Sequence, residues 1–412
     1  MSGDLSFEIP ELGENGKIDR AVDFLNDNFD ILVDEMDPGK TYITDKTDGN
    51  PISFDEIYLT LKNRNFNIGR SDLFTILRVP KYFKKVNIVK NYLETMQGKY
   101  KGESHIDLLC SYITARDFGD KEPGYYTNRM KNLIRKWLVA SAACSLGYHV
   151  NDVVLVFIDD EGVGKTSLTR YLWPKQLINH CQVLTQDTNK FNFPELFSRK
   201  FIVVFDELVG INHRRPEEFK QIMSTQDCMI YFPHDPFPRT VPRTANALGT
   251  SNKNQEKGGF ITNDLGLRRF GSIELSKIDW RGYSKVVDTD QIWAEVMMLI
   301  SQDFNYVFDE TDWEEFKNYN RRFMIETIQT KVLRTHYSIP DPDETRTEFY
   351  MSATDVYNDI IKRKLCRKED MFKLTVSNIG SALTHLEFPQ KAIRKKSGSG
   401  NPAYMYHIKF FN

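Results

Sequence analysis

A glycine-rich turn followed by lysine and threonine is the part of the chain whose residue types could hold a phosphate. The apolar run 153–158 is typical of a buried strand. It leads through a short turn to the expected helix 167–172, and the turn ends in Gly162-Val163-Gly164-Lys165-Thr166-Ser167. Backbone N–H groups of such a turn point at an anion, and the helix N-terminus adds its positive end. We therefore predict an ATP site, with Lys165 on the β- and γ-phosphates and the Thr166 hydroxyl on Mg²⁺.

One residue departs from the usual pattern of this turn. The pattern G-x-x-x-x-G-K-[ST] begins with glycine, whereas this chain has Asp159 there. An acidic residue with a Cβ atom restricts the backbone and brings negative charge near the phosphates. Asp159 therefore counts against tight nucleotide binding or fast turnover.

Two adjacent carboxylates follow the next apolar run, 201–205. At the tip of a strand, Asp206 can hold Mg²⁺ through water, and Glu207 can polarise an attacking water molecule. This division of roles is the hydrolytic form of phosphoryl transfer. A solvent-exposed acidic strand end is the alternative, and the phosphate turn upstream favours the catalytic interpretation.

Two further strands end or begin at polar residues that suit the same reaction. The strand 245–250 leads to Asn252, whose amide could hydrogen-bond both the γ-phosphate and the water. Arg268 and Arg269 precede the strand 270–275, and either could act on an adjacent subunit as an arginine finger. The other arginine could instead form an ion pair with Asp264, and the sequence leaves this choice open.

These strands alternate with helical stretches, which predicts an α/β fold with a parallel sheet. Helices are expected over 18–29, 125–146, 291–304 and 313–337, and Ser53 with Glu56 predicts a capping box for a helix that reaches Leu61. At 412 residues the chain exceeds one ordinary core. We expect a small α+β domain over 1–90, a P-loop domain over 91–340 and a winged helix over 351–412.

The composition is typical of a globular protein, and the sequence predicts neither a membrane-spanning segment nor a zinc site. Hydrophobic residues make up 40% and charged residues 27% of the chain. No apolar run approaches a membrane span, and the acidic first ten residues do not resemble a signal peptide. The five cysteines lack C-x-x-C spacing and the histidines lack ligand spacing, which indicates reduced thiols in a cytosol and no zinc site.

Two basic segments point to nucleic acid. Residues 229–243 predict a β-hairpin whose tip suits contact with the backbone of single- or double-stranded DNA in a pore; its basic residues are His234, Arg239 and Arg243. Near the C-terminus, two expected helices (351–366 and 375–386) precede a hairpin, an order typical of a winged helix. Its phosphate contacts on duplex DNA would be Arg394, Lys395 and Lys396. A proline-rich surface loop and a protein-docking module are the respective alternatives.

The order of these motifs resembles the virulence-associated protein E family of phage and mobile-element proteins. That family is a branch of the superfamily 3 helicase-like AAA+ ATPases. The resemblance spans roughly residues 90–335 and includes Lys136-Trp137-Leu138-Val139 before the phosphate turn. It implies a P-loop AAA+ core and a homo-hexameric ring in the cytoplasm of a bacterial host. It also implies the roles given above for Lys165, Thr166, Asp206, Glu207, Asn252 and the paired arginines.

The resemblance implies a DNA-stimulated ATPase that acts as a hexameric DNA helicase in replication. Since the first 90 residues contain no zinc ribbon and no obvious polymerase-like carboxylate triad, we expect a separate primase to make primers. A nucleotide-gated switch or defence ATPase, docking a partner through the winged helix, is one alternative. An origin-binding initiator without unwinding activity is the other.

Overall fold

The structure, a computed structural model, describes ten stretches of the chain. They are residues 16–37, 41–79, 81–185, 192–208, 216–231, 237–254, 257–262, 265–340, 350–393 and 403–410. The chain divides into two compact units, residues 1–322 and 323–412. Each unit is described below by itself.

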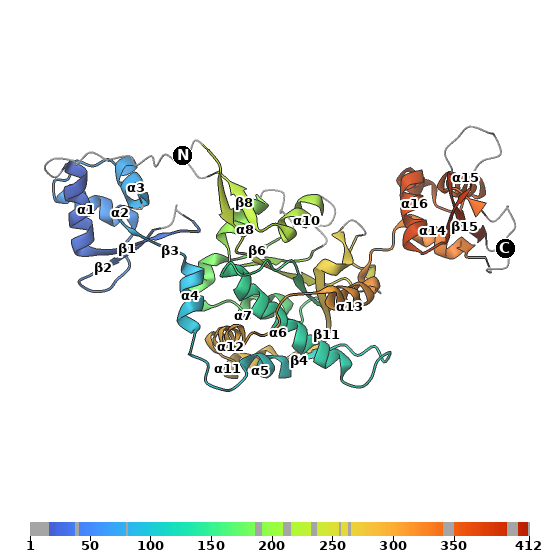
Figure 1. The fold of residues 1–412 in the computed structure, drawn as a ribbon, viewed down its shortest axis with the longest axis horizontal. Coiled ribbons are helices and arrows are strands. Elements are labelled where there is room, and N and C mark those ends of the chain that lie inside the picture. The colour runs from blue at the N-terminus through green and yellow to red at the C-terminus, as the bar shows by residue number, and fades with distance from the viewer. Residues whose placement is uncertain are drawn as a thin grey trace, which may run out of the picture. The chain divides into compact units, whose positions relative to one another are not determined.

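The first unit is built around a largely parallel sheet (Figure 1). In the described part of the chain this sheet has six strands. In sheet order they are β4 (Ile113–Ala115), β11 (Phe270–Ile278), β5 (Val154–Ile158), β10 (Asn246–Ser251), β7 (Ile202–Phe205) and β6 (Cys181–Leu184). All neighbouring pairs run parallel except β4, which pairs with β11 in the antiparallel direction. The predicted α/β fold with a parallel sheet is therefore confirmed.

Three adjacent strands of the sheet are buried along their whole length; β5 and β7 are entirely apolar, whereas β10 also carries buried polar residues. Every residue of β5, β7 and β10 is buried, as expected for parallel strands covered on both faces. Each of these strands begins one residue after its predicted start, while β11 extends three residues beyond its predicted end. Because the strands are parallel, the polar residues that follow β5, β7 and β10 meet at one edge of the sheet.

The long helix α6 (Tyr125–Ser145) packs on this sheet through an apolar stripe and a buried polar group. Its Trp137 Nε1 donates to the carbonyl of Val153 at 3.0 Å. Asn246, fully buried at the start of β10, donates to the carbonyls of Ser141 at 3.0 Å and Phe201 at 3.3 Å. One amide thus joins the helix, β10 and the segment that begins β7.

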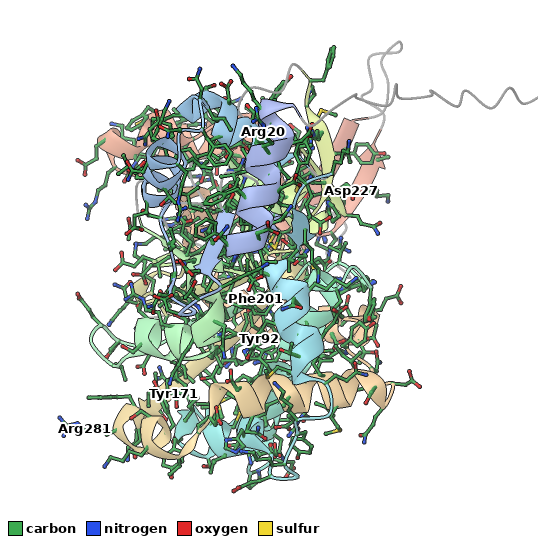
Figure 2. All side chains as sticks on the ribbon, turned by 90° about the vertical axis from the view of Figure 1, so that its left-hand side faces the viewer. Arg20, Tyr92, Tyr171, Phe201, Asp227 and Arg281 are labelled. Atoms are coloured by element: carbon green, nitrogen blue, oxygen red, sulfur yellow. The ribbon has the colours of Figure 1, made fainter. Side chains whose placement is uncertain are left out.

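Further helices surround the sheet within this unit. They are α4 (Ile88–Met96), α5 (His105–Ser111), α7 (Lys165–Tyr171), η1 (Lys175–His180), α8 (Phe193–Arg199), α10 (Pro216–Ser224), η5 (Leu267–Arg269), α11 (Trp280–Val286), α12 (Thr289–Ser301), α13 (Glu310–Asn320) and η6 (Arg321–Phe323). Figure 2 shows Tyr92 on α4 near α12, and its hydroxyl donates to Asp290 Oδ1 at 2.8 Å. Also on α12, Trp293 packs against Phe201 with ring centroids 4.9 Å apart.

The N-terminal part of this unit has its own apolar core, which ends at Phe83. It comprises α1 (Lys17–Asn28), β1 (Phe29–Asp34), β2 (Thr41–Asp45), α2 (Phe54–Asn63), α3 (Arg70–Arg78) and β3 (Lys84–Val86). The sheet order is β2-β1-β3, with β1–β2 antiparallel and β1–β3 parallel. The predicted capping box is confirmed, because Ser53 Oγ accepts from the Glu56 amide and the Glu56 carboxylate accepts from the Ser53 amide.

In its described residues, the second unit contains three α-helices, one 3₁₀ helix, a three-stranded sheet and a separate strand pair. They are α14 (Ile328–His336), α15 (Ala353–Arg363), η8 (Lys368–Lys373), α16 (Val376–His385), β13 (Tyr350–Met351), β14 (Gln390–Ile393) and β15 (Ala403–His407), with β12 (Tyr337–Ser338) pairing β16 (Lys409–Phe410). The sheet order is β13-β15-β14, and both pairs are antiparallel. The two helices and the hairpin expected after residue 351 are present, and their assignment as a winged helix stays a prediction.

The single helix expected over 313–337 is wrong, because the chain turns there. The chain leaves α13 at Asn320, whose amide donates to the carbonyls of Leu267 at 2.8 Å and Phe270 at 2.6 Å. A new cap at Thr327 then starts α14, whose Val332 and Leu333 belong to the core of the second unit. The second compact unit begins at residue 323. None of the described helices is long and apolar enough to cross a membrane.

The Asn246 amide generates a prediction about stability. Asn246→Ala should lower the free energy of unfolding by about 3 kcal/mol or more, because several buried partners lose their hydrogen bond at once. Calorimetric melting of the full chain measures this loss. Asn132→Ala, at an exposed position of α6, is the matched control and should change the melting temperature little. Equal melting temperatures for both variants would contradict the role of the buried amide.

Candidate active site

A polar cavity opens where the chain leaves β5, β7 and β10. Its volume is about 380 Å³, and its lining comes from the phosphate turn, the two carboxylates after β7 and the end of β10. The lining residues are Glu161, Gly162, Gly164, Lys165, Thr166, Ser167, Asp206, Glu207, Thr250, Ser251 and Asn252. The structure thus brings together the residues that the sequence predicted for ATP, Mg²⁺, water and the γ-phosphate, apart from the two arginines and Val163, which do not line the cavity.

The phosphate turn has the backbone shape that an anion cradle needs. Gly162 and Gly164 have φ angles of 83° and 98°, a region that disfavours side chains, and a Cβ atom at either position would meet nothing within 4 Å. Helix α7 begins directly at Lys165, with Gly164 as its N-cap. The amides of the first helical turn therefore face an open space that a phosphate could fill.

The Lys165 ammonium bonds to the turn itself. Its Nζ donates to the carbonyl of Asp159 at 2.8 Å and to that of Asp160 at 2.5 Å. Burial lowers the pKa of this ammonium, while the charges of Asp159 and Asp160 act in the opposite direction. A phosphate would have to replace these carbonyls as the partner of the lysine.

The acidic residues at the start of the turn differ in their surroundings. Asp159 Oδ1 accepts from the Asp160 amide at 2.7 Å, but its buried Oδ2 has no hydrogen-bond partner among the described residues. Burial raises the pKa of the Asp159 carboxyl. Asp160 is exposed and pairs with Lys257 Nζ at 2.6 Å, a contact that lowers its pKa. The φ angle of Asp159 is not positive, so the residue adds charge at this position without backbone strain.

The two candidate Mg²⁺ ligands lie side by side. The Thr166 hydroxyl donates to Asp206 Oδ1 at 3.2 Å. In the described stretches no three His, Cys, Asp or Glu side chains gather as a ligand group. A hydroxyl and one carboxylate, completed by phosphate oxygens and water, nevertheless match the way Mg²⁺ binds at nucleotide sites. The residues present therefore fit the ion.

Glu207 and Asn252 also meet across the cavity. Asn252 Nδ2 donates to Glu207 Oε1 at 3.3 Å. Glu207 has a φ angle of 48°, which is uncommon for a residue with a side chain and occurs often at functional sites. The candidate general base is thus held by the candidate γ-phosphate sensor in a strained turn.

Thr250 is a site residue that the sequence interpretation missed. Its hydroxyl donates to Asp206 Oδ1 at 2.5 Å, and it accepts from the Glu207 amide at 3.3 Å. A hydroxyl as the penultimate residue of a strand beside the carboxylate strand was the available signal. It was missed because threonine at a buried strand position is also an ordinary strand former.

The paired arginines lie at the opposite edge of the sheet. They directly precede Phe270, which pairs with Val154 at the start of β5, whereas the phosphate turn follows the end of β5. Arg268 stacks over the Trp313 ring at 4.9 Å. Arg269 donates to the Leu265 carbonyl at 3.3 Å and to Ser224 Oγ at 3.4 Å, and burial lowers its pKa. Neither arginine lines the cavity of its own chain, and Asp264 lies outside the described residues.

The predicted DNA contacts have different outcomes. The hairpin is present as β8 (Asp227–Ile230) and β9 (Arg239–Pro242), with Arg239 exposed. Arg243 is only 2% exposed and donates to the carbonyls of Met223 at 3.1 Å and Asn151 at 2.8 Å. The expectation that Arg243 contacts DNA is therefore corrected, because its guanidinium is used inside the fold. The other predicted contacts, His234, Arg394, Lys395 and Lys396, lie outside the described residues.

The fold and the site define a mixed α/β protein with a phosphate-type turn at the carboxyl edge of a largely parallel sheet. Residues 93–325, more than half of the chain, match the virulence-associated protein E-like domain. The chain belongs to the virulence-associated protein E-like family. No curated protein matches it.

Two solved structures of the NrS-1 C-terminal region are similar to this chain at low sequence identity. The apo structure has 13% identity and a TM-score of 0.48, and the match covers 96% of this chain and 100% of that chain. Its A form has 12% identity and a TM-score of 0.46, with 95% of this chain and 100% of that chain covered. At these values neither structure contributes to the argument about chemistry.

The partnerless oxygen of Asp159 predicts a pH-dependent effect on stability. Burial raises the pKa of the Asp159 carboxyl above its ordinary value of 3.8. The folded state therefore binds the carboxyl proton more tightly than the unfolded state does. The ionised carboxylate then destabilises the fold at neutral pH, and the penalty fades as the pH falls toward 3.8. Asp159→Asn should therefore raise the melting temperature more at about pH 7 than at about pH 4.

Asp160→Asn is the matched control for this experiment. Its ion pair with Lys257 lowers the pKa of Asp160, so its stabilisation is present above the unfolded pKa and is lost as the pH falls. The Asp160 variant should be less stable than the parent at neutral pH, opposite in sign to Asp159→Asn. A gain for Asp159→Asn that is equal at both pH values would contradict the assigned cause.

The buried position of Arg243 predicts a structural effect of replacing it. Arg243→Met should cost about 1–3 kcal/mol for each carbonyl left without a donor, as measured by calorimetric melting. Below its melting temperature the variant should keep the salt dependence of DNA binding, because the guanidinium does not reach a phosphate. Arg239→Ala, on exposed β9, should keep the parental melting temperature and weaken the salt dependence of DNA binding. If the Arg243 variant kept the parental stability and showed a weaker salt dependence of DNA binding, Arg243 would be a DNA contact after all.

Proposed function

We propose that the protein hydrolyses ATP with Mg²⁺ and uses this reaction to open DNA as a hexameric helicase of a phage or mobile element. One observation carries the proposal: Thr166, Asp206 and Glu207 line the same cavity as the phosphate turn. A hydroxyl and a carboxylate suited to Mg²⁺ then stand beside a second carboxylate suited to a water molecule. Phosphoryl transfer to water requires these groups together.

In the proposed reaction the turn binds the phosphates and the two carboxylates divide the remaining roles. The amides at the start of α7 and the Lys165 ammonium hold phosphate oxygens, while Thr166 and Asp206 would hold Mg²⁺. The ion, when bound, neutralises charge on the β- and γ-phosphates. Glu207 orients the water and accepts its proton as the water oxygen bonds to the γ-phosphorus. The bond from that phosphorus to the β–γ bridging oxygen breaks, and ADP and phosphate leave.

Two contacts of the nucleotide-free chain would change in this reaction. Lys165 would exchange the carbonyls of Asp159 and Asp160 for phosphate oxygens. Asn252 would exchange the Glu207 carboxylate for the γ-phosphate, which frees Glu207 to take up the water. The second exchange makes the base available only when a triphosphate is in place.

The position of the arginines supports an oligomer. Arg268 and Arg269 precede β11 at the edge of the sheet away from the cavity, so neither could reach a nucleotide in its own chain. An arginine finger from this segment therefore has to serve the cavity of an adjacent subunit. A ring in which each subunit supplies the next, here a homo-hexamer, satisfies this geometry.

The hairpin supports contact with single-stranded DNA. Tyr231 and Phe237 flank its tip and are 70% and 75% exposed. Exposed rings on a hairpin can stack on successive bases without reading sequence, and the exposed Arg239 adds positive charge. Duplex DNA would be bound by the second unit through Arg394, Lys395 and Lys396, and a separate primase would supply primers.

Variants of the cavity test the hydrolytic reaction. Lys165→Ala should abolish both nucleotide binding and ATP hydrolysis. Glu207→Gln should keep binding but lower kcat by about 10²–10⁴, because only the transfer of the proton is lost. Glu94→Gln, an exposed carboxylate of α4, is the matched control and should hydrolyse ATP at the parental rate. Parental activity in Lys165→Ala would refute the site.

The DNA-dependent part of the proposal has a separate readout. Single-stranded DNA should raise the ATPase rate of the parent chain, and a forked substrate should be unwound. Slow hydrolysis at a rate that DNA does not change, together with a nucleotide-dependent change in the mass of the assembly, would instead favour a nucleotide-gated switch. Sequence-specific duplex binding that is lost without residues 351–412, and without unwinding, would favour an origin-binding initiator.

A further inference from the structure

We propose that Thr250 is a positioning residue whose hydroxyl couples the Mg²⁺ ligand Asp206 to the general base Glu207. The inference rests on the proposed function and deepens it. It assigns a part of the reaction to a residue that touches neither the nucleotide nor the water. The consequence is that metal binding and base placement are set by one oxygen atom.

The Thr250 hydroxyl lies between the two carboxylate residues. Thr250 is 2% exposed, and its Oγ1 is 2.5 Å from Asp206 Oδ1 and 3.3 Å from the Glu207 amide nitrogen. A hydroxyl has one proton and two lone pairs. An ionised carboxylate only accepts, so the proton goes to Asp206 and a lone pair receives the Glu207 N–H. The directions of both hydrogen bonds are thereby fixed.

The first hydrogen bond orients the metal ligand. Asp206 Oδ1 accepts from two hydroxyls, those of Thr250 at 2.5 Å and Thr166 at 3.2 Å. Hydrogen bonds to a carboxylate are short and roughly twice as strong as those between neutral groups. Outer partners of this kind orient a ligand and raise the affinity for the metal. When Thr166 turns to Mg²⁺, Thr250 remains as the hydroxyl that holds the carboxylate in place.

The second hydrogen bond secures the strained turn of the base. The φ angle of 48° at Glu207 is unfavourable for a residue with a Cβ atom and must be over-determined by its surroundings. Thr250 supplies two of these restraints, since its Oγ1 accepts from the Glu207 amide and its carbonyl accepts from the Leu208 amide at 3.2 Å. The turn after β7 is thus attached to β10 by consecutive amides.

The residue before Thr250 allows this close approach. A Cβ atom on Gly249 would lie 2.8 Å from Leu208 Cδ1 and 3.2 Å from Val156 Cγ2. A side chain there would force the buried Leu208 side chain to shift. The absence of a side chain at residue 249 therefore lets Leu208 pack directly against β10 beside Thr250.

The chemistry of the side chain explains why threonine is suited to this position. Its β-branch restricts χ1, so the hydroxyl is held in one direction, and its methyl group fills the buried position. Serine keeps the hydroxyl but loses this restriction, whereas valine keeps the shape and loses the hydroxyl. The two substitutions therefore separate the hydrogen bonds from the packing.

Metal-dependent nucleotide binding is the first measurement. A fluorescent ATP analogue is titrated with Mg²⁺ against the full chain, after its binding has been measured with excess EDTA. Thr250→Val should raise the half-saturating Mg²⁺ concentration about tenfold or more, with EDTA binding unchanged, because the phosphate turn is intact. Thr250→Ser should lie between the parent and the valine variant.

Steady-state hydrolysis is the second measurement. At saturating Mg²⁺ and ATP, Thr250→Val should still show a kcat reduced at least tenfold with a nearly constant KM, since the base is misplaced and the nucleotide is not. Rescue of kcat by Thr250→Ser is expected. Thr244→Val, two residues before the start of β10, is the matched control. Its hydroxyl donates to the Lys200 carbonyl at 3.0 Å, far from the cavity, so both measurements should match the parent.

The outcomes separate this inference from the proposed function. A Thr250→Val variant with the parental Mg²⁺ requirement and kcat would overturn the inference while leaving the ATPase assignment intact. A parent chain that binds Mg²⁺ and nucleotide but does not hydrolyse ATP would end the ATPase assignment, and the Mg²⁺ titration would still decide the role of Thr250. Equal losses in Thr250→Val and Thr250→Ser would also overturn the inference, because the hydroxyl would then be irrelevant.

Discussion

The site depends on the hydrogen bonds that converge on one carboxylate oxygen, Asp206 Oδ1. Thr166 reaches it from the helix after β5 and Thr250 from β10, so three segments distant in sequence meet at one atom. This meeting is possible because β10 lies between β5 and β7 and all three strands run in the same direction. Reversal of any of these strands would remove its polar end from the cavity.

The opposite end of β10 is fixed in a comparable way. Asn246 bonds to α6 and to the start of β7, while Thr250 bonds to the turn that follows β7. Asn246 and Thr250 are thus two buried polar residues on one strand, with three residues between them; the first serves stability and the second serves the site. Strand β10 is therefore held to β7 by side chains at both ends as well as by the ladder between them.

Sequence reasoning predicted the features that depend on local pattern and strand direction. Apolar runs followed by Gly-Lys-Thr, Asp-Glu and Ser-Asn place their polar residues at one sheet edge if the strands are parallel, and the cavity contains all of them. The same reasoning could not predict features that depend on residues distant in the sequence. Arg243 is a basic residue of a type that usually lies on the surface, but here it is buried. Nothing in the sequence around Asn320 indicates that its amide bonds to the start of β11 and that the expected helix therefore ends there. The role of Thr250 was hidden for the same reason, because its two partners lie more than forty residues away.

The contacts of the Lys165 ammonium carry a consequence for selectivity. The cation bonds to two carbonyls of its own turn, so an incoming anion has to compete with these carbonyls for the ammonium. A single inorganic phosphate would have to displace both carbonyls with one small anion, close to the acidic Asp159 and Asp160. If the turn binds ATP as proposed, a polyphosphate chain would contact more amides than a single phosphate and would compensate for that displacement. The turn would then select anions by their length.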